Sequence, residues 1–166
     1  GPIVLLGALT LLAATSVPLS HKFSAIPKRH GVTRIPLTAG YGSGWSILFI
    51  ALFGAASLSL ACAESYERDV ESVTVSVLAA CLWAPLFIQD TPGCLWGSTC
   101  MLILAATAAA VAAASRPIAT WKSARWARWG ASGLLTGWLL LAVGWNIACA
   151  AEGETLKKQT LIATAM

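Results

Sequence analysis

The sequence predicts an all-α membrane protein, a single bundle of five transmembrane helices. Of its 166 residues, 57% are hydrophobic and only 11% are charged, and the mean hydropathy is +0.74. A soluble domain of this size needs about 25% charged residues to cover its surface, so an ordinary soluble fold is excluded. No segment alternates with the period of a strand, and in lipid only helices then satisfy the backbone.

Five apolar runs predict the helices, and together they form one domain over residues 1–166. Crossing a hydrocarbon core of about 30 Å takes about 20 helical residues, which the second, fourth and fifth runs provide. The first run is barely long enough, and the third is short, with Pro85 predicting a break near its end. The predicted helices cover residues 2–19, 45–63, 73–88, 94–114 and 131–151.

The connections between these runs differ in length and charge. The first, residues 20–44, is long and basic, which predicts a functional or partner-binding loop. It holds His21 and His30, which we expect to be solvated rather than metal ligands, because no acidic residue is near them in the sequence. The second connection is acidic and the third is a tight turn. Lys and Arg fall almost equally on the two sides, so the positive-inside rule gives no orientation.

Indoles and cations alternate in the fourth connection, just before the last predicted helix. Such a segment is typical of a membrane interface, where cations snorkel to the headgroups and stack on aromatic rings. A specific site for an anionic lipid or a carboxylate is the sharper alternative. The residues of this predicted membrane-interface segment are Trp121, Lys122, Arg125, Trp126, Arg128 and Trp129.

Small residues recur at four-residue spacing on the last two predicted helices. Ala105, Ala109 and Ala113 form one such row, and Gly133 and Gly137 form another. Close backbone approach at small residues is the usual means of helix association in lipid, and we expect these rows to hold the bundle together rather than form a dimer face. The five cysteines are expected to act as small apolar residues, not as metal or redox sites.

A polar residue interrupts the last apolar run. Trp138, Ala142 and Asn146 are spaced at i, i+4 and i+8, which places them on one stripe of a helix. A carboxamide buried in hydrocarbon costs a few kcal/mol of free energy unless a partner forms hydrogen bonds with it. We therefore expect Asn146 to face either a neighbouring helix or a ligand.

Several function classes are disfavoured by what the chain lacks. No nucleophile, base and orienting group occur together, and no phosphate-cradling glycine loop is present, so we expect no enzyme. The apolar runs carry no mid-helix charge, which argues against a proton pump or an ion-coupled transporter. Nothing indicates binding to nucleic acid. The first residue is Gly1 rather than Met, which predicts a processed or trimmed chain.

Three segments resemble the translocator protein (tryptophan-rich sensory protein, TspO) family. The second apolar run contains Trp45-Ser-Ile-Leu48-Phe49, similar to the family's W-x-x-L-Y. The third contains Trp83-Ala-Pro-Leu-Phe87, similar to W-x-P-L-F, and the fifth has its Trp, Ala and Asn at the family's spacing. The aromatic and proline motif of the family's first loop is absent, and the Pro-Tyr before the fifth-helix Trp is Leu134-Leu135.

The resemblance implies a five-helix bundle, often a homodimer, with a cavity that opens toward the first loop. Members of the family bind porphyrins, sterols and aromatic drug-like molecules. The resemblance thus implies a non-covalent tetrapyrrole (porphyrin or chlorophyll), a sterol or another lipid as the ligand. By position, the residues that it places around the cavity are Trp45, Trp83, Trp138, Ala142 and Asn146.

Two hypotheses follow for the function. The first is a non-catalytic protein that binds a tetrapyrrole or a similar flat apolar ligand among its indoles. The second is an accessory structural subunit of a photosynthetic or respiratory membrane complex, which packs against partner helices and contacts pigments or lipids. Both place the chain in an organellar membrane, mitochondrial or plastid. The ligand-binding hypothesis comes first, and retained packing motifs together with a lost first-loop motif give weight to the second.

Overall fold

In the computed structural model, residues 1–30, 41–61, 68–114 and 123–165 are described. They form helices and no strand, which confirms the predicted all-α class. The helices are α1 (Pro2–Ser16), α2 (Ser20–Arg29), α3 (Tyr41–Ala61), α4 (Arg68–Phe87), α5 (Pro92–Ala114) and α6 (Ser123–Ala165).

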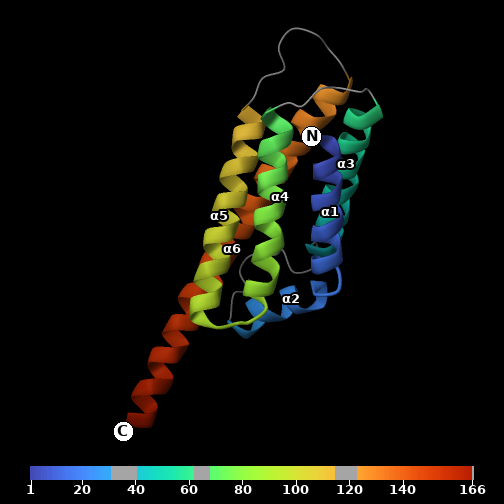
Figure 1. The fold of residues 1–166 in the computed structure, drawn as a ribbon. Coiled ribbons are helices and arrows are strands. Elements are labelled where there is room, and N and C mark those ends of the chain that lie inside the picture. The colour runs from blue at the N-terminus through green and yellow to red at the C-terminus, as the bar shows by residue number, and fades with distance from the viewer. Residues whose placement is uncertain (31–40, 62–67, 115–122, 166) are drawn as a thin grey trace.

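Five of these helices close a ring. Helix α4 packs between α1 and α5, α6 packs between α5 and α3, and α3 returns to α1. Helix α2 lies across one end of this ring and touches α6 (Figure 1). The last turns of α6 leave the bundle and project past that end, so the C-terminus stands away from the other helices (Figure 1).

Three of the five expected spans have the length and hydropathy to cross a membrane. They are Arg68–Phe87, Pro92–Ala114 and Arg125–Thr155, and they give the chain the character of a multi-pass integral membrane protein. Among the described residues, Pro2–Ser16 and Ser46–Ala61 are also apolar but shorter. With 20 residues, α4 is about 30 Å long, the thickness of a hydrocarbon core.

The predicted first loop and the predicted start of the third helix were both wrong. The loop expected over residues 20–44 contains α2, because Phe23 and Ile26 are three residues apart and bury one face of a short helix despite Pro27. Helix α4 begins at Arg68 instead of residue 73, since Asp69 and Glu71 in its first turn suit the positive end of the helix dipole.

The last helix is much longer than the predicted 131–151. Its start takes in part of the Trp-rich basic segment, and its end continues through a polar tail. Neither segment contains a proline that would stop the helix. The tight turn expected between the third and fourth runs is present, with Asp90 in the left-handed region at φ 52° and Pro92 opening α5.

The two rows of small residues have different surroundings. Ala105 and Ala109 are fully buried inside the bundle, which confirms their predicted packing role. Gly133 and Gly137 instead face outward on α6, where an added Cβ would meet no atom within 4 Å. The expectation that this glycine pair holds the bundle together was therefore wrong, because the face it occupies points away from the neighbouring helices.

Candidate functional site

Asn146 forms a hydrogen-bonded node inside the bundle, close to its α2 end, with partners in the last turns of α4 and the first turns of α5. Its side chain is 2% exposed, and its Oδ1 accepts a bond from the Trp83 indole N–H at 3.1 Å. Its amide nitrogen donates toward Ser98 Oγ at 2.5 Å, Thr99 Oγ1 at 3.0 Å and the Leu95 carbonyl at 3.2 Å. The partners of Asn146 are therefore neighbouring helices, and this node joins α4, α5 and α6.

An aromatic stack lies beside this node. The Trp83 ring is stacked on Phe87, with centroids 5.4 Å apart, and both come from α4. Phe23 of α2 lies 4.9 Å from Trp83 and 6.2 Å from Phe87, so the short helix inserts a ring into the end of the bundle. All three side chains are buried. Phe23 thus covers part of the Trp83 ring inside the bundle.

The remaining predicted cavity residues are separated from this stack. Ala142 is buried and Trp138 is half-buried, both on α6 one and two turns before Asn146. Trp45 lies on α3, and its side chain is outside the described residues. Sequence reasoning brought Trp83 and Asn146 together correctly but missed Phe23, whose only signal was an isolated aromatic residue in a polar segment.

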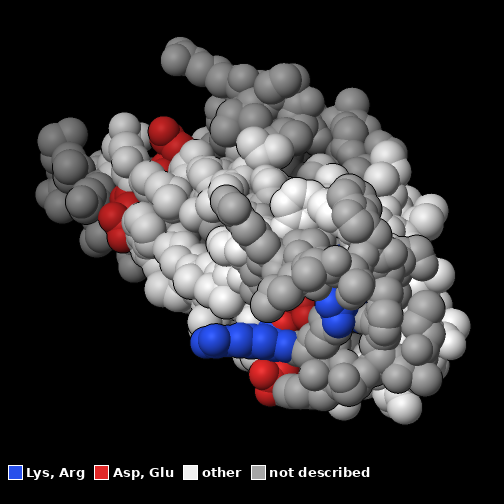
Figure 2. Space-filling model, turned by 90° about the horizontal axis from the view of Figure 1, so that it is seen from above, with Lys and Arg blue, Asp and Glu red and all other residues white. Residues whose placement is uncertain are grey.

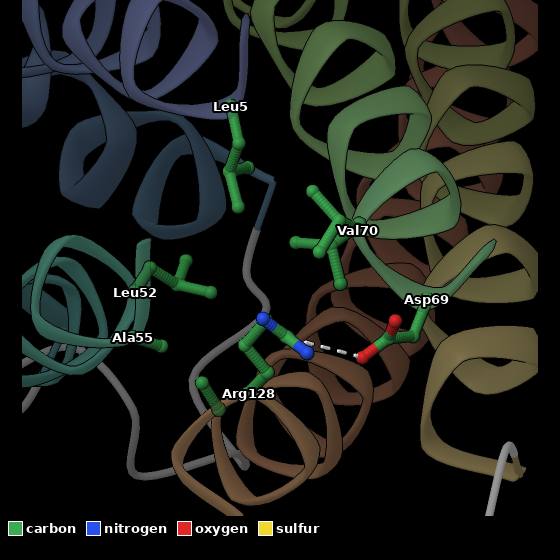
Figure 3. Close-up of a pocket in the computed structure, with 8 residues that line it drawn as sticks. Leu5, Leu52, Ala55, Asp69, Val70 and Arg128 are labelled. Carbon is green, nitrogen blue, oxygen red and sulfur yellow. Dashed lines mark ion pairs between the residues drawn. The ribbon is translucent and has the colours of Figure 1, made fainter. Parts of the chain in front are cut away.

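A charged cluster lies at the end of the bundle where α4 and α6 begin. Arg128 is only 4% exposed, its Nη1 donates to Ser59 Oγ at 2.6 Å, and its Nε lies 3.4 Å from Asp69 Oδ2. These three residues come from α6, α3 and α4. Figure 3 shows Arg128 reaching toward Asp69 between Leu5, Leu52 and Val70. The cavity here has a volume of about 10 Å³, the least that admits one water molecule.

A second charged cluster lies at the opposite end of α4. Asp90, in the turn after α4, accepts from His30 Nε2 at 2.6 Å and from Arg29 at 3.0 Å. The His30 ring fits against Gly153 of α6, where an added Cβ would lie 3.4 Å from its Cε1. The expectation of a solvated His30 was therefore wrong. Its acidic partner is 60 residues away in the sequence and becomes a neighbour only through the fold.

The predicted membrane-interface segment divides into buried and exposed side chains. Arg128 is buried in its ion pair, Arg125 and Trp126 are half-buried, and Trp129 is exposed and donates its N–H to the Ala113 carbonyl at 2.8 Å. Trp121 and Lys122 lie outside the described residues. Figure 2 shows this end of the molecule, where described basic and acidic side chains lie close together.

The described residues hold no group of three or more His, Cys, Asp or Glu side chains that could bind a metal ion. Cys81, Cys94, Cys100 and Cys149 are free thiols. The chain was compared with protein-family models, curated proteins and solved structures, and none matches. The site is therefore defined by its own geometry: a neutral node with an aromatic stack close to the α2 end, and a charged cluster near each end.

Proposed function

We propose that this chain is a non-catalytic membrane protein of the translocator type, which binds a flat apolar ligand such as a tetrapyrrole against Trp83. The observation that carries the proposal is the tilted ring contact between Phe23 and Trp83, with centroids 4.9 Å apart. A ring from a short peripheral helix covers an indole whose N–H is held by Asn146. A planar ligand would replace the Phe23 ring and bury its own apolar faces on the same aromatic surface.

The arrangement of the helices supports this proposal. Five helices close a ring, and the segment that follows α1 folds back as α2 over one end of it. The resemblance to the translocator family places the cavity mouth toward that same segment. Helix α2 has ten residues and contacts the ring less extensively than the five long helices contact one another, so it is the element that moves at least cost.

Porphyrin titration of the purified chain in lipid nanodiscs tests the proposal. Protoporphyrin binding is followed by the quenching of tryptophan fluorescence. Phe23→Ala removes the competing ring, and since an aromatic pair is worth about 0.5–1.5 kcal/mol, affinity should rise about 2- to 12-fold. Trp83→Phe removes both the indole face and its bond to Asn146 and should weaken binding.

Phe53→Ala is the matched control, because Phe53 pairs with Phe49 on α3 rather than with Trp83. This variant should bind porphyrin like the parent chain. Equal affinity in the Phe23→Ala, Trp83→Phe and parent chains, or no binding by any of them, contradicts the proposal.

A second candidate is an accessory subunit of an organellar membrane complex, which two observations favour. Helix α6 continues beyond the bundle, and Gly133 and Gly137 face outward, where another helix could approach closely. We expect a chain that ends after Thr155 to keep its thermal stability but to migrate apart from the native complex on a blue-native gel. Co-migration of this truncated chain with the complex would count against the subunit hypothesis.

A further inference from the structure

An apolar groove lies on the outer face of the ring, between α3 and α6. It is separate from the aromatic stack and from the charged cluster at α2. Its floor is made of small residues and its rims of larger apolar ones, and no charged side chain lines it. The lining residues include Gly54, Ala55 and Leu58 of α3 and Trp126, Gly130 and Leu134 of α6.

No side chain of the described residues fills this groove. A Cβ added at Gly54 or at Gly130 would meet no atom within 4 Å, so neither glycine is required by packing inside the chain. Glycine costs a helix roughly 1 kcal/mol relative to alanine, and here two glycines from different helices face the same space. The groove is therefore a feature of both helices together and not of one row of small residues.

The groove has a defined depth in the membrane. Its upper end, at Trp126 and Leu58, is level with Arg128 and Ser59, whose pairing with Asp69 places charge at this end of the bundle. Its lower end is at Leu134, eight residues after Trp126 on α6. Eight helical residues rise about 12 Å, which takes the groove toward the bilayer centre. The groove thus begins at the headgroup level and descends into the hydrocarbon core.

Its dimensions select a narrow occupant. A cavity volume of about 380 Å³ spread over about 12 Å gives a mean cross-section of about 32 Å², that of a cylinder about 6 Å across. A helix with its side chains is about 10–12 Å in diameter and does not enter a groove of this width. An apolar, unbranched chain does.

We propose that this groove binds one acyl chain of a glycerophospholipid, whose phosphate headgroup lies beside the half-buried Trp126. Three observations support this occupant over a second copy of the chain. The lining is wholly apolar, the groove starts where headgroups lie, and the neighbouring, half-buried Arg125 supplies a cation at the depth of the phosphate. Indoles favour this same headgroup level.

Native mass spectrometry of the chain, released from nanodiscs of phosphatidylcholine and phosphatidylglycerol, tests the proposal. We expect the parent chain to retain one phospholipid. Gly54→Leu and Gly130→Leu each place a side chain in the groove, and both should lose that phospholipid. Gly133→Leu is the matched control, because it also projects into open space from α6 but outside the groove, and it should keep the lipid.

A second measurement does not depend on retention after release. Phospholipids brominated near the headgroup should quench Trp126 fluorescence, seen as the difference between the parent chain and Trp126→Phe. Gly130→Leu should reduce this quenching. Unchanged lipid retention and quenching in both groove variants would overturn the proposal. It would also be overturned if the groove variants turned a dimeric parent chain into a monomer that still binds the lipid, because a second copy would then be the occupant. If the parent chain retains a detergent molecule as well as it retains the phospholipid, the groove binds an adventitious additive only, and this result would also overturn the proposal.

Discussion

The Asn146 node and the α4–α6 end of the bundle both bury polar groups, but they do so with different chemistry. Inside the α2 end, Asn146 is neutral, and both ends of its carboxamide are hydrogen-bonded to α4 and α5. At the end, Arg128 is buried as a cation and is matched by the carboxylate of Asp69 and the hydroxyl of Ser59. The depth of each group in the bundle determines which chemistry is tolerated.

The reason is the cost of desolvation. A charge at the bilayer centre is expensive, whereas near the headgroups water and opposite charges are close. Burying a neutral amide costs less desolvation free energy, and a few hydrogen bonds within the membrane satisfy its donors and acceptor. This comparison teaches that the node orders the helices, whereas the end cluster fixes where α3, α4 and α6 meet. Substitutions at the end should therefore cost more than those at the node.

Arg128→Met should have the largest effect. Breaking a buried ion pair from one side leaves Asp69 without its cation, and such losses are about 3–5 kcal/mol. The free energy of unfolding, measured by titrating the detergent-solubilised chain with sodium dodecyl sulfate, should fall by this amount. A loss below that of the node variant would reverse the order proposed for the two regions.

The double variant Arg128→Met with Asp69→Leu is the control for that prediction. Removing both charges replaces the pair with apolar side chains, and such replacement is often neutral. Most of the lost stability should return. If the double variant is as unstable as Arg128→Met alone, then lost packing rather than unpaired charge explains the effect.

Asn146→Leu should have an intermediate effect. Hydrogen bonds between membrane helices average about 0.6 kcal/mol and reach about 1.7, and this substitution removes the bonds that join α6 to α4 and α5. We expect a loss of about 1–2 kcal/mol in the same titration. Ser98 and Thr99 keep their bonds to the Leu95 carbonyl, which limits the cost. A loss above 3–5 kcal/mol would make the node, not the end cluster, the dominant constraint.

Asp90→Asn should have the smallest effect and a local one. Asparagine tolerates the left-handed backbone of this turn, so the substitution removes the charge without disturbing φ. Its partners Arg29 and His30 belong to the end of α2, and partly exposed pairs are worth about 1 kcal/mol or less. Amide hydrogen exchange should accelerate up to about fivefold in α2 and stay unchanged in α4 and α5. Uniform acceleration would show that the pair stabilises the whole bundle.

The sequence determined a large part of this fold. Low charge and long apolar runs predicted helices of membrane type, and three of them have spanning length. The buried amide of Asn146 predicted a partner, and the indole N–H of Trp83 is one such partner. These inferences succeeded because hydrophobicity and hydrogen-bond satisfaction act locally, wherever a residue lies in the bundle.

Only the tertiary structure decided the pairings between distant segments. His30 bonds to Asp90, Arg128 pairs with Asp69, and the Phe23 ring contacts that of Trp83. No pattern in the sequence signals any of these contacts. The same is true of Gly133 and Gly137, whose spacing indicates packing but does not say whether it occurs within the chain. Spacing along a helix places residues on a shared face. Which neighbour that face meets depends on how all the helices pack together, and this is decided only when the ring closes.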